Sequence, residues 1–191
     1  MKIHYCSDLH LDFGADLTLP GGEVLILAGD IAEANIFTEP EIQNFWTTEC
    51  SKYDKVFYVL GNHEHYHGKF WKTKTELERV LPKNVTVLEN QCEEYEGIVF
   101  IGATLWTDMN KEDPLTLHGI RGYMNDYRII DNSGTVPVSF RDQDGNSHEK
   151  VGYLIPEDTV VEHKAMLETI SAVCDSHKDK KIVVCGHHAP S

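Results

Sequence analysis

Four short runs of apolar residues divide the chain, and apolar and polar positions do not alternate strictly within them. They cover residues Ile3–Cys6, 24–28, 56–60 and 182–185. Runs of this length, rich in Val, Ile, Leu and aromatic residues, are typical of strands buried on both faces, as in a parallel sheet. We therefore predict four buried strands.

Three longer segments between these runs have the features of helices. Residues 38–50 offer Thr38 as a helix cap and Pro40 in the first turn. Residues 70–81 place apolar residues at helical spacing before a proline, and residues 156–176 do so over a longer span. Strands that alternate with helices predict a layered α/β fold.

The middle of the chain has a different pattern. Residues 85–88, 93–95 and 98–103 indicate short strands, with a hairpin turn at Glu96-Gly97. Residues 136–140 and 150–154 flank the polar segment 142–146, which indicates a second hairpin. We interpret this part as extra strands and loops before the last helix and strand. The prediction is one domain, residues 1–191, with an inserted strand and loop region at about 103–155.

The composition is that of an ordinary globular protein, with 41% hydrophobic and 25% charged residues. No apolar run approaches the ~20 residues that a membrane span needs. The first ten residues contain no long apolar stretch, so they do not resemble a secretory signal. We therefore expect a cytoplasmic protein with no membrane partner.

The charge balance and the cysteines exclude further classes. Acidic residues outnumber basic residues by 31 to 17, and the formal charge of -14 disfavours long nucleic acids as partners. A small phosphorylated substrate remains compatible if metal ions supply the local positive charge. The five cysteines are far apart and form no CxxC pair, so we expect reduced, mostly buried thiols.

Polar residues of one chemical kind follow each of the four apolar runs. These segments are Ser7-Asp8-Leu9-His10, Gly29-Asp30, Gly61-Asn62-His63-Glu64 and Gly186-His187-His188. In a parallel sheet all four would emerge at the same carboxyl edge, where α/β folds bind their ligands. We therefore predict that they form one site.

The donor atoms of this site suit a pair of divalent metal ions. Carboxylate, imidazole and amide donors are compatible with Mn, Fe, Zn, Co or Mg. Asp30 can bridge two ions ~3.5–4 Å apart, since its carboxylate has two oxygens. Asp8 and Asp30 neutralise only part of the charge of two such ions, so the site would attract a phosphate and acidify a bridging water.

In this order, the motifs DxH, GD, GNHE and a late strand ending in HHAPS resemble the calcineurin-like metallophosphoesterase family over nearly the whole chain. The resemblance implies an α/β fold, a layered β-sandwich flanked by helices, and two divalent ions, of which we favour Mn in vitro. It assigns Asp8, His10 and Asp30 to one ion, and Asp30, Asn62 and His187 to the other. His63 would protonate the leaving oxygen or hold the phosphate, and Asn62 beside it would also bind the substrate.

One further stretch and one departure qualify this resemblance. The segment 124–128, MNDYR, is similar to a stretch in some bacterial and viral members, where Arg128 would contact the substrate phosphate or, as we favour, form a structural ion pair. The family pattern continues with a GHxH motif that residues 1–191 lack. A longer protein, a natural truncation and a completing second chain are the explanations, and we favour the first. The fold would then be C-terminally incomplete, and an exposed strand edge could support self-association.

Other polar and aromatic residues receive more ordinary roles. We expect His65 and His67 to pack or cap, His188 to support the site or the core, and Asp12 to accept hydrogen bonds within its loop. Surface positions are the default for four further histidines, and the segment 142–146 is interpreted as a solvated turn. The four histidines are His118, His148, His163 and His177. The tryptophans Trp46, Trp71 and Trp106 are expected to pack, with Trp106 and Tyr123 as candidates for a substrate entrance.

The predicted function is hydrolysis of a phosphate monoester or diester by a hydroxide that bridges the metal ions, without a covalent intermediate. The alternative is a catalytically weak or inactive binding or scaffold module of the same fold. The sequence does not identify the phosphoester, because the same metal chemistry serves many of them.

Overall fold

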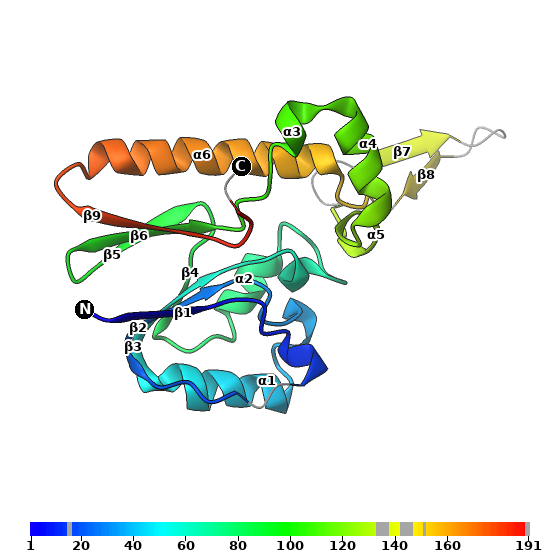
Figure 1. Ribbon diagram of the computed structural model, residues 1–191. Coiled ribbons are helices and arrows are strands. Elements are labelled where there is room, and N and C mark those ends of the chain that lie inside the picture. Colours follow the sequence, from blue (N-terminus) through cyan, green and yellow to red (C-terminus); the bar gives the residue numbers. More distant parts are fainter. Residues whose placement is uncertain (15–16, 133–137, 142–146, 151, 190–191) are drawn as a thin grey trace.

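In the computed structural model, two sheets packed face to face form the centre of the molecule (Figure 1). The structure describes residues 1–14, 17–132, 138–141, 147–150 and 152–189. The first sheet is fully parallel, in the order β1 (Ile3–Cys6), β2 (Gly22–Ala28), β3 (Tyr53–Val59) and β4 (Val85–Val87). The second contains β5 (Gln91–Tyr95), β6 (Ile98–Ala103) and β9 (Lys181–Gly186), with β6 in the middle.

Helices cover the outer face of each sheet. On the first sheet lies α1 (Pro40–Asn44), which continues as the π-helical turn η3 (Phe45–Glu49) and the 3-10 turn η4 (Cys50–Lys52), together with α2 (Thr73–Glu78). On the second lies α6 (Pro156–Ser176), at the predicted bounds. The predicted α/β sandwich with flanking helices is confirmed.

β2 and β3 are buried on both faces, which explains why their sequences do not alternate. β1 and β9 lie at sheet edges and are only partly buried, so the prediction of four buried strands is only partly met. In β2, Val24 and Ile26 belong to the core between the sheets, while Leu25 and Leu27 belong to the core under the helices. Phe57 of the first sheet stacks on Phe100 of the second, with ring centroids 4.2 Å apart. Apolar side chains on both faces of β2 and β3 are therefore removed from water, and this burial stabilises the sandwich.

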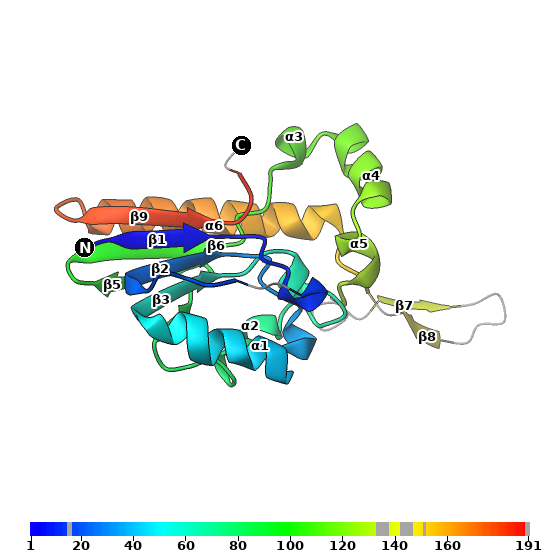
Figure 2. The same ribbon diagram turned by 60° about the horizontal axis from the view of Figure 1, so that its bottom comes forward.

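The fourth apolar run does not join the sheet that contains the first three. β9 pairs in parallel with β6, in the register Ile98↔Lys181, so the prediction of one shared sheet edge is wrong. The carboxyl ends of β1 and β9 nevertheless lie on the same side of the sandwich (Figure 2). The polar residues after β9 therefore still reach those after β2.

The second helix is shorter than residues 70–81 because its first residues are tied elsewhere. The backbone N–H of Phe70 donates to the carbonyl oxygen of Asp131 (2.9 Å), and its ring packs beside a separate core. That core contains Trp106, Tyr127 and Ile130. α2 therefore begins only at Thr73.

The middle of the chain contains three helices that were not predicted. They are α3 (Met109–Glu112), whose residues have left-handed backbone angles, α4 (Pro114–Tyr123) and α5 (Asp126–Ile129). The sequence signal for α4 is Asp113 followed directly by Pro114. Asp113 caps the helix by accepting a hydrogen bond from the N–H of Thr116, and Pro114 stands in the first turn. β4, β5 and β6 belong to the two sheets and are not extra strands.

The second predicted hairpin is present, as β7 (Val138–Arg141) and β8 (Ser147–Lys150) paired antiparallel, but its second strand ends at residue 150, where the predicted strand 150–154 begins. It projects from the sandwich beside α4 and α5 (Figure 1). The polar segment 142–146 lies outside the described residues. Among the described helices, none combines the length and apolar character needed to cross a bilayer.

Candidate metal centre

The loop after β1 places Asp8 and His10 beside the end of β2. The N–H of Asp8 donates to the carbonyl oxygen of Gly29 (3.0 Å), and that of His10 donates to the carbonyl oxygen of Asp30 (3.1 Å). Asp8, His10 and Asp30 all have left-handed backbone angles, with φ of 54°, 43° and 55°. This conformation costs about 1–2 kcal/mol for a residue with a Cβ, and such residues cluster at functional sites.

Asp30 lies between two imidazoles that come from different sheets. Its Oδ2 is 3.8 Å from His10 Nε2, and its Oδ1 is 3.4 Å from His187 Nε2. His187 Nδ1 is 2.8 Å from the carbonyl oxygen of Ala28, to which it must donate, so in the neutral ring Nε2 carries the lone pair. The two oxygens of the Asp30 carboxylate therefore face two different imidazole nitrogens, each of which could bind a metal ion.

The residues around Asp30 fit divalent metal ions. Donor atoms of Asp8, His10 and Asp30 lie within 4.8 Å of one another. Two carboxylates this close repel each other unless a cation lies between them. On the other side of Asp30, His187 has the tautomer that metal ligation requires.

Asn62 lies next to Asp30 through its neighbour in sequence. The backbone N–H of His63 donates to Asp30 Oδ1 (2.9 Å), so the backbone of residues 62 and 63 lies next to the carboxylate. The amide Nδ2 of Asn62 donates to Asp126 Oδ1 (2.8 Å). The pKa of Tyr66, which donates to the same Asp126 oxygen (2.8 Å), is raised by burial and by the Asp126 charge.

Glu64 supports the centre from below with a fully buried carboxylate. It accepts hydrogen bonds from the N–H groups of Asp30 (3.0 Å), Ile31 (2.7 Å) and Gly61 (2.6 Å) and from the hydroxyl of Tyr58 (2.6 Å). Burial and the charge of Asp30 raise the pKa of Glu64, while these donors oppose the rise. No role was predicted for Glu64, although it stands within the GNHE motif.

The glycines that precede Asp30 and Asn62 are required by close packing. A Cβ on Gly61 would lie 2.1 Å from Asp30 Oδ1. A Cβ on Gly29, whose φ is +86°, would lie 2.6 Å from His187 Nδ1. The motifs GD and GN thus allow the strand ends to approach the carboxylate and the imidazole.

His63 is paired with Asp12, which is an acceptor as expected but not for its own loop. His63 Nε2 is 3.1 Å from Asp12 Oδ2, and the ring centroids of His63 and His10 are 4.6 Å apart. His10, Asp12 and His63 also form a group that could hold an ion. We interpret Asp12 and His63 as a hydrogen-bonded pair, because their atoms are already at hydrogen-bond distance.

Four further histidines have structural contacts. His65 is buried against Thr73 (2.8 Å), and burial lowers its pKa to about 3. His67 contacts Glu33 (2.8 Å) at the surface. His188 lies 3.2 Å from the carbonyl oxygen of Thr104, and burial lowers its pKa. The surface prediction for His163 is wrong, since this residue is 4% exposed and contacts the carbonyl oxygen of Leu105 (2.8 Å).

Other predicted residues lie as follows. Arg128 is exposed and donates to the carbonyl oxygen of Gly122. Trp46 and Trp106 are buried, while Trp71 and Tyr123 are exposed. All five cysteines are free thiols, but Cys92 and Cys174 are exposed, so the expectation of mostly buried thiols is only partly met.

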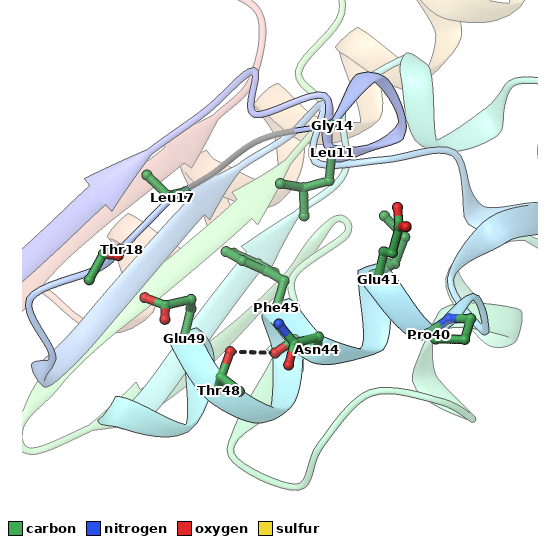
Figure 3. A pocket seen from close by; sticks show the side chains of 11 residues that line it. Leu11, Gly14, Leu17, Thr18, Pro40, Glu41, Asn44, Phe45, Thr48 and Glu49 are labelled. Atoms are coloured by element: carbon green, nitrogen blue, oxygen red, sulfur yellow. Dashed lines mark hydrogen bonds between the residues drawn. The ribbon is translucent and has the colours of Figure 1, made fainter.

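A cavity of about 560 Å³ lies between the loop after β1 and the α1 segment (Figure 3). Leu11, Pro40 and Phe45 are among its lining residues, and Leu11 directly follows His10. None of the predicted metal ligands lines it. The candidate centre is therefore a separate site at the strand ends.

Comparison with known proteins agrees with this geometry. The calcineurin-like phosphoesterase family model matches residues 1–191, and the chain belongs to this family of metal-dependent hydrolases of phosphoesters. It is 26% identical over 212 residues to the uncharacterized protein L509 of Acanthamoeba polyphaga mimivirus, covering 98% of this chain and 68% of that protein.

A solved structure supports the fold. The phosphopantetheinyl hydrolase (PptH) of Mycobacterium tuberculosis matches with a TM-score of 0.62 at 15% identity, over 98% of this chain and 68% of that chain. At this identity the likeness shows the fold alone.

Proposed function

We propose that this protein hydrolyses a small phosphate monoester or diester with two divalent metal ions held on either side of Asp30. The observation that carries the proposal is the position of Asp30 between His10 and His187. Asp8 and His10 would complete one ion site, and Asn62 and His187 the other. Mn is the ion we favour in vitro.

The ions, when bound, supply positive charge for the phosphate and acidify water. Residues of the chain would align the substrate and supply a proton. His63 would donate a proton to the leaving oxygen, and the Asp12 carboxylate, 3.1 Å away, would stabilise the imidazole in its protonated form. The net charge of -14 favours a small substrate, since an extended polyanion would meet repulsion outside the metal centre.

Substitution of the bridging residue tests the proposal. Metal-free protein would be reloaded with Mn²⁺, Co²⁺, Zn²⁺ or Mg²⁺ and assayed with p-nitrophenyl phosphate and bis(p-nitrophenyl) phosphate. Asp30→Ala should lower hydrolysis by more than about 100-fold and reduce the number of ions bound per chain. Asp54→Ala, which removes an exposed carboxylate from β3, is the matched control and should leave both values unchanged.

Two results would contradict the proposal. If Asp30→Ala hydrolysed the esters as fast as the unaltered chain, Asp30 would not be a bridging ligand. Ion binding by the unaltered chain, without turnover of either ester under any of the four metals, would instead support a binding module of the same fold.

A further inference from the structure

α5 brings a buried carboxylate to the edge of the candidate centre. Asp126 is 1% exposed, and its Oδ1 accepts hydrogen bonds from the amide of Asn62 (2.8 Å) and the hydroxyl of Tyr66 (2.8 Å). Tyr66 is also 3.2 Å from the amide nitrogen of Asn62. These three side chains form a closed group, although Asp126 is 64 residues from Asn62 in sequence.

The group decides which end of the Asn62 amide faces the centre. The oxygen and nitrogen of an amide have nearly the same shape, so packing alone does not select between the two orientations. A carboxylate accepts hydrogen bonds but does not donate them, so it selects the amide nitrogen. The amide oxygen is then turned away from Asp126, and oxygen is the amide atom that binds a hard divalent cation.

We infer that Asp126 is a positioning residue of the metal centre, which orients the Asn62 amide so that its oxygen is offered to an ion. The inference rests on the proposed function. It gives the MNDYR segment a role through its aspartate, whereas Arg128 of the same segment is exposed and contacts Gly122.

The neighbours of Asp126 hold it firmly enough for this role. Tyr127 is 6% exposed and Ile130 is fully buried, and both belong to the core that also contains Trp106. The N–H of Ile130 donates to the carbonyl oxygen of Asp126 (3.2 Å). α5 is thereby fixed in the core next to the strand ends, so the carboxylate cannot follow a flipped amide.

Titration calorimetry with Mn²⁺ on metal-free protein tests the inference. Asp126→Ala should weaken the binding of one ion by about 10–100-fold and leave the other ion within about threefold. Asp126→Asn should weaken it less, because an amide oxygen still accepts a neutral hydrogen bond from Asn62. Asp113→Ala, which removes the cap of α4 in the same region, should lower the melting temperature without changing Mn²⁺ affinity.

A double-variant comparison tests whether Asp126 acts through Asn62. In an Asn62→Ala background, Asp126→Ala should cause no further loss of Mn²⁺ affinity. Additive losses in the double variant would overturn the inference. So would a loss in Asp126→Asn as large as in Asp126→Ala, because the effect would then come from charge and not from the acceptor.

The failure of this inference is distinguishable from failure of the proposed function. If the unaltered chain neither binds Mn²⁺ nor hydrolyses either ester, both are overturned. If it does both and Asp126→Ala behaves like Asp113→Ala, only the inference is overturned. Should Asp126→Ala not fold, Tyr66→Phe offers a second test, because it removes a hydroxyl that donates to Asp126. It should weaken the binding of one ion by about threefold, and unchanged affinity would overturn the inference.

Discussion

The two sides of Asp30 are held in different ways. On the β1 side, Asp8 and His10 have left-handed backbones, Asp8 is exposed, and His10 Nδ1 has no hydrogen-bond partner in the part of the chain that the structure describes. On the other side, Asn62 and His187 are largely buried, and each side chain donates to a fixed acceptor.

This difference separates two ways of building a metal centre. The β1 side is placed by backbone hydrogen bonds between two neighbouring strand ends, so its geometry depends on main-chain groups and not on the side chains of other residues. The Asn62 side is oriented by side-chain and carbonyl acceptors far away in sequence, at Asp126 and Ala28. Distant substitutions should therefore affect the second side more than the first.

Glu64→Gln should have the largest effect on stability and ion binding. Glu64 lies under both sides of Asp30, so its substitution should weaken both sides equally. Its new NH₂ group would face N–H donors, leaving at least one of them unpaired in the interior. We expect the free energy of unfolding to fall by about 3 kcal/mol and Mn²⁺ binding to weaken on both sides of Asp30. Chemical denaturation and calorimetry measure the two effects.

Glu78→Gln is the matched control for this prediction, since Glu78 is an exposed residue of α2. It should change neither stability nor ion binding. If Glu64→Gln lost only one ion, Glu64 would support one side alone.

Asp12→Asn should have an intermediate effect that is confined to the β1 side. The variant keeps a polar group near His63 but removes the carboxylate charge that would stabilise the ring in its proton-donating form. We expect kcat to fall by about 10–100-fold while the number of bound ions stays the same. A lower ion count would instead assign Asp12 to the ligand group that it forms with His10 and His63.

The effect that is smallest near neutral pH concerns His65, which lies three residues after Asn62. Burial lowers its pKa to about 3, so below pH ~6.5 the unfolded chain binds a proton that the folded chain does not. Stability should therefore fall with decreasing pH, by roughly 1.4 kcal/mol per pH unit from this residue, between about pH 6.5 and 3. Above pH ~6.5 this residue should contribute no pH dependence.

Denaturation of metal-free protein at several pH values measures this contribution. His65→Phe should become more stable relative to the unaltered chain as the pH falls, whereas His67→Gln, which changes an exposed ring, should not show this trend. A constant difference between His65→Phe and the unaltered chain across this range would contradict the buried, neutral state of His65.

The sequence predicted the ends of the strands better than their partners. The apolar runs and the polar residues after them are local features, so β1 and the residues Asp8, Asp30 and His187 could be located directly. The assignment of β9 to a second sheet depends on how α6 returns the chain, which no local pattern records. The acceptors Asp126 and Ala28 were missed for the same reason, because one is a distant side chain and the other a backbone carbonyl.

His187 follows a strand of one layer, and Asp30 follows a strand of the other. The thickness of the sandwich, which depends on stacked rings such as Phe57 and Phe100, therefore sets the separation of these two ligands. Repacking the interior far from any polar residue would therefore change the distance between these two candidate ligand side chains, so the core volume and the geometry of the candidate centre are coupled.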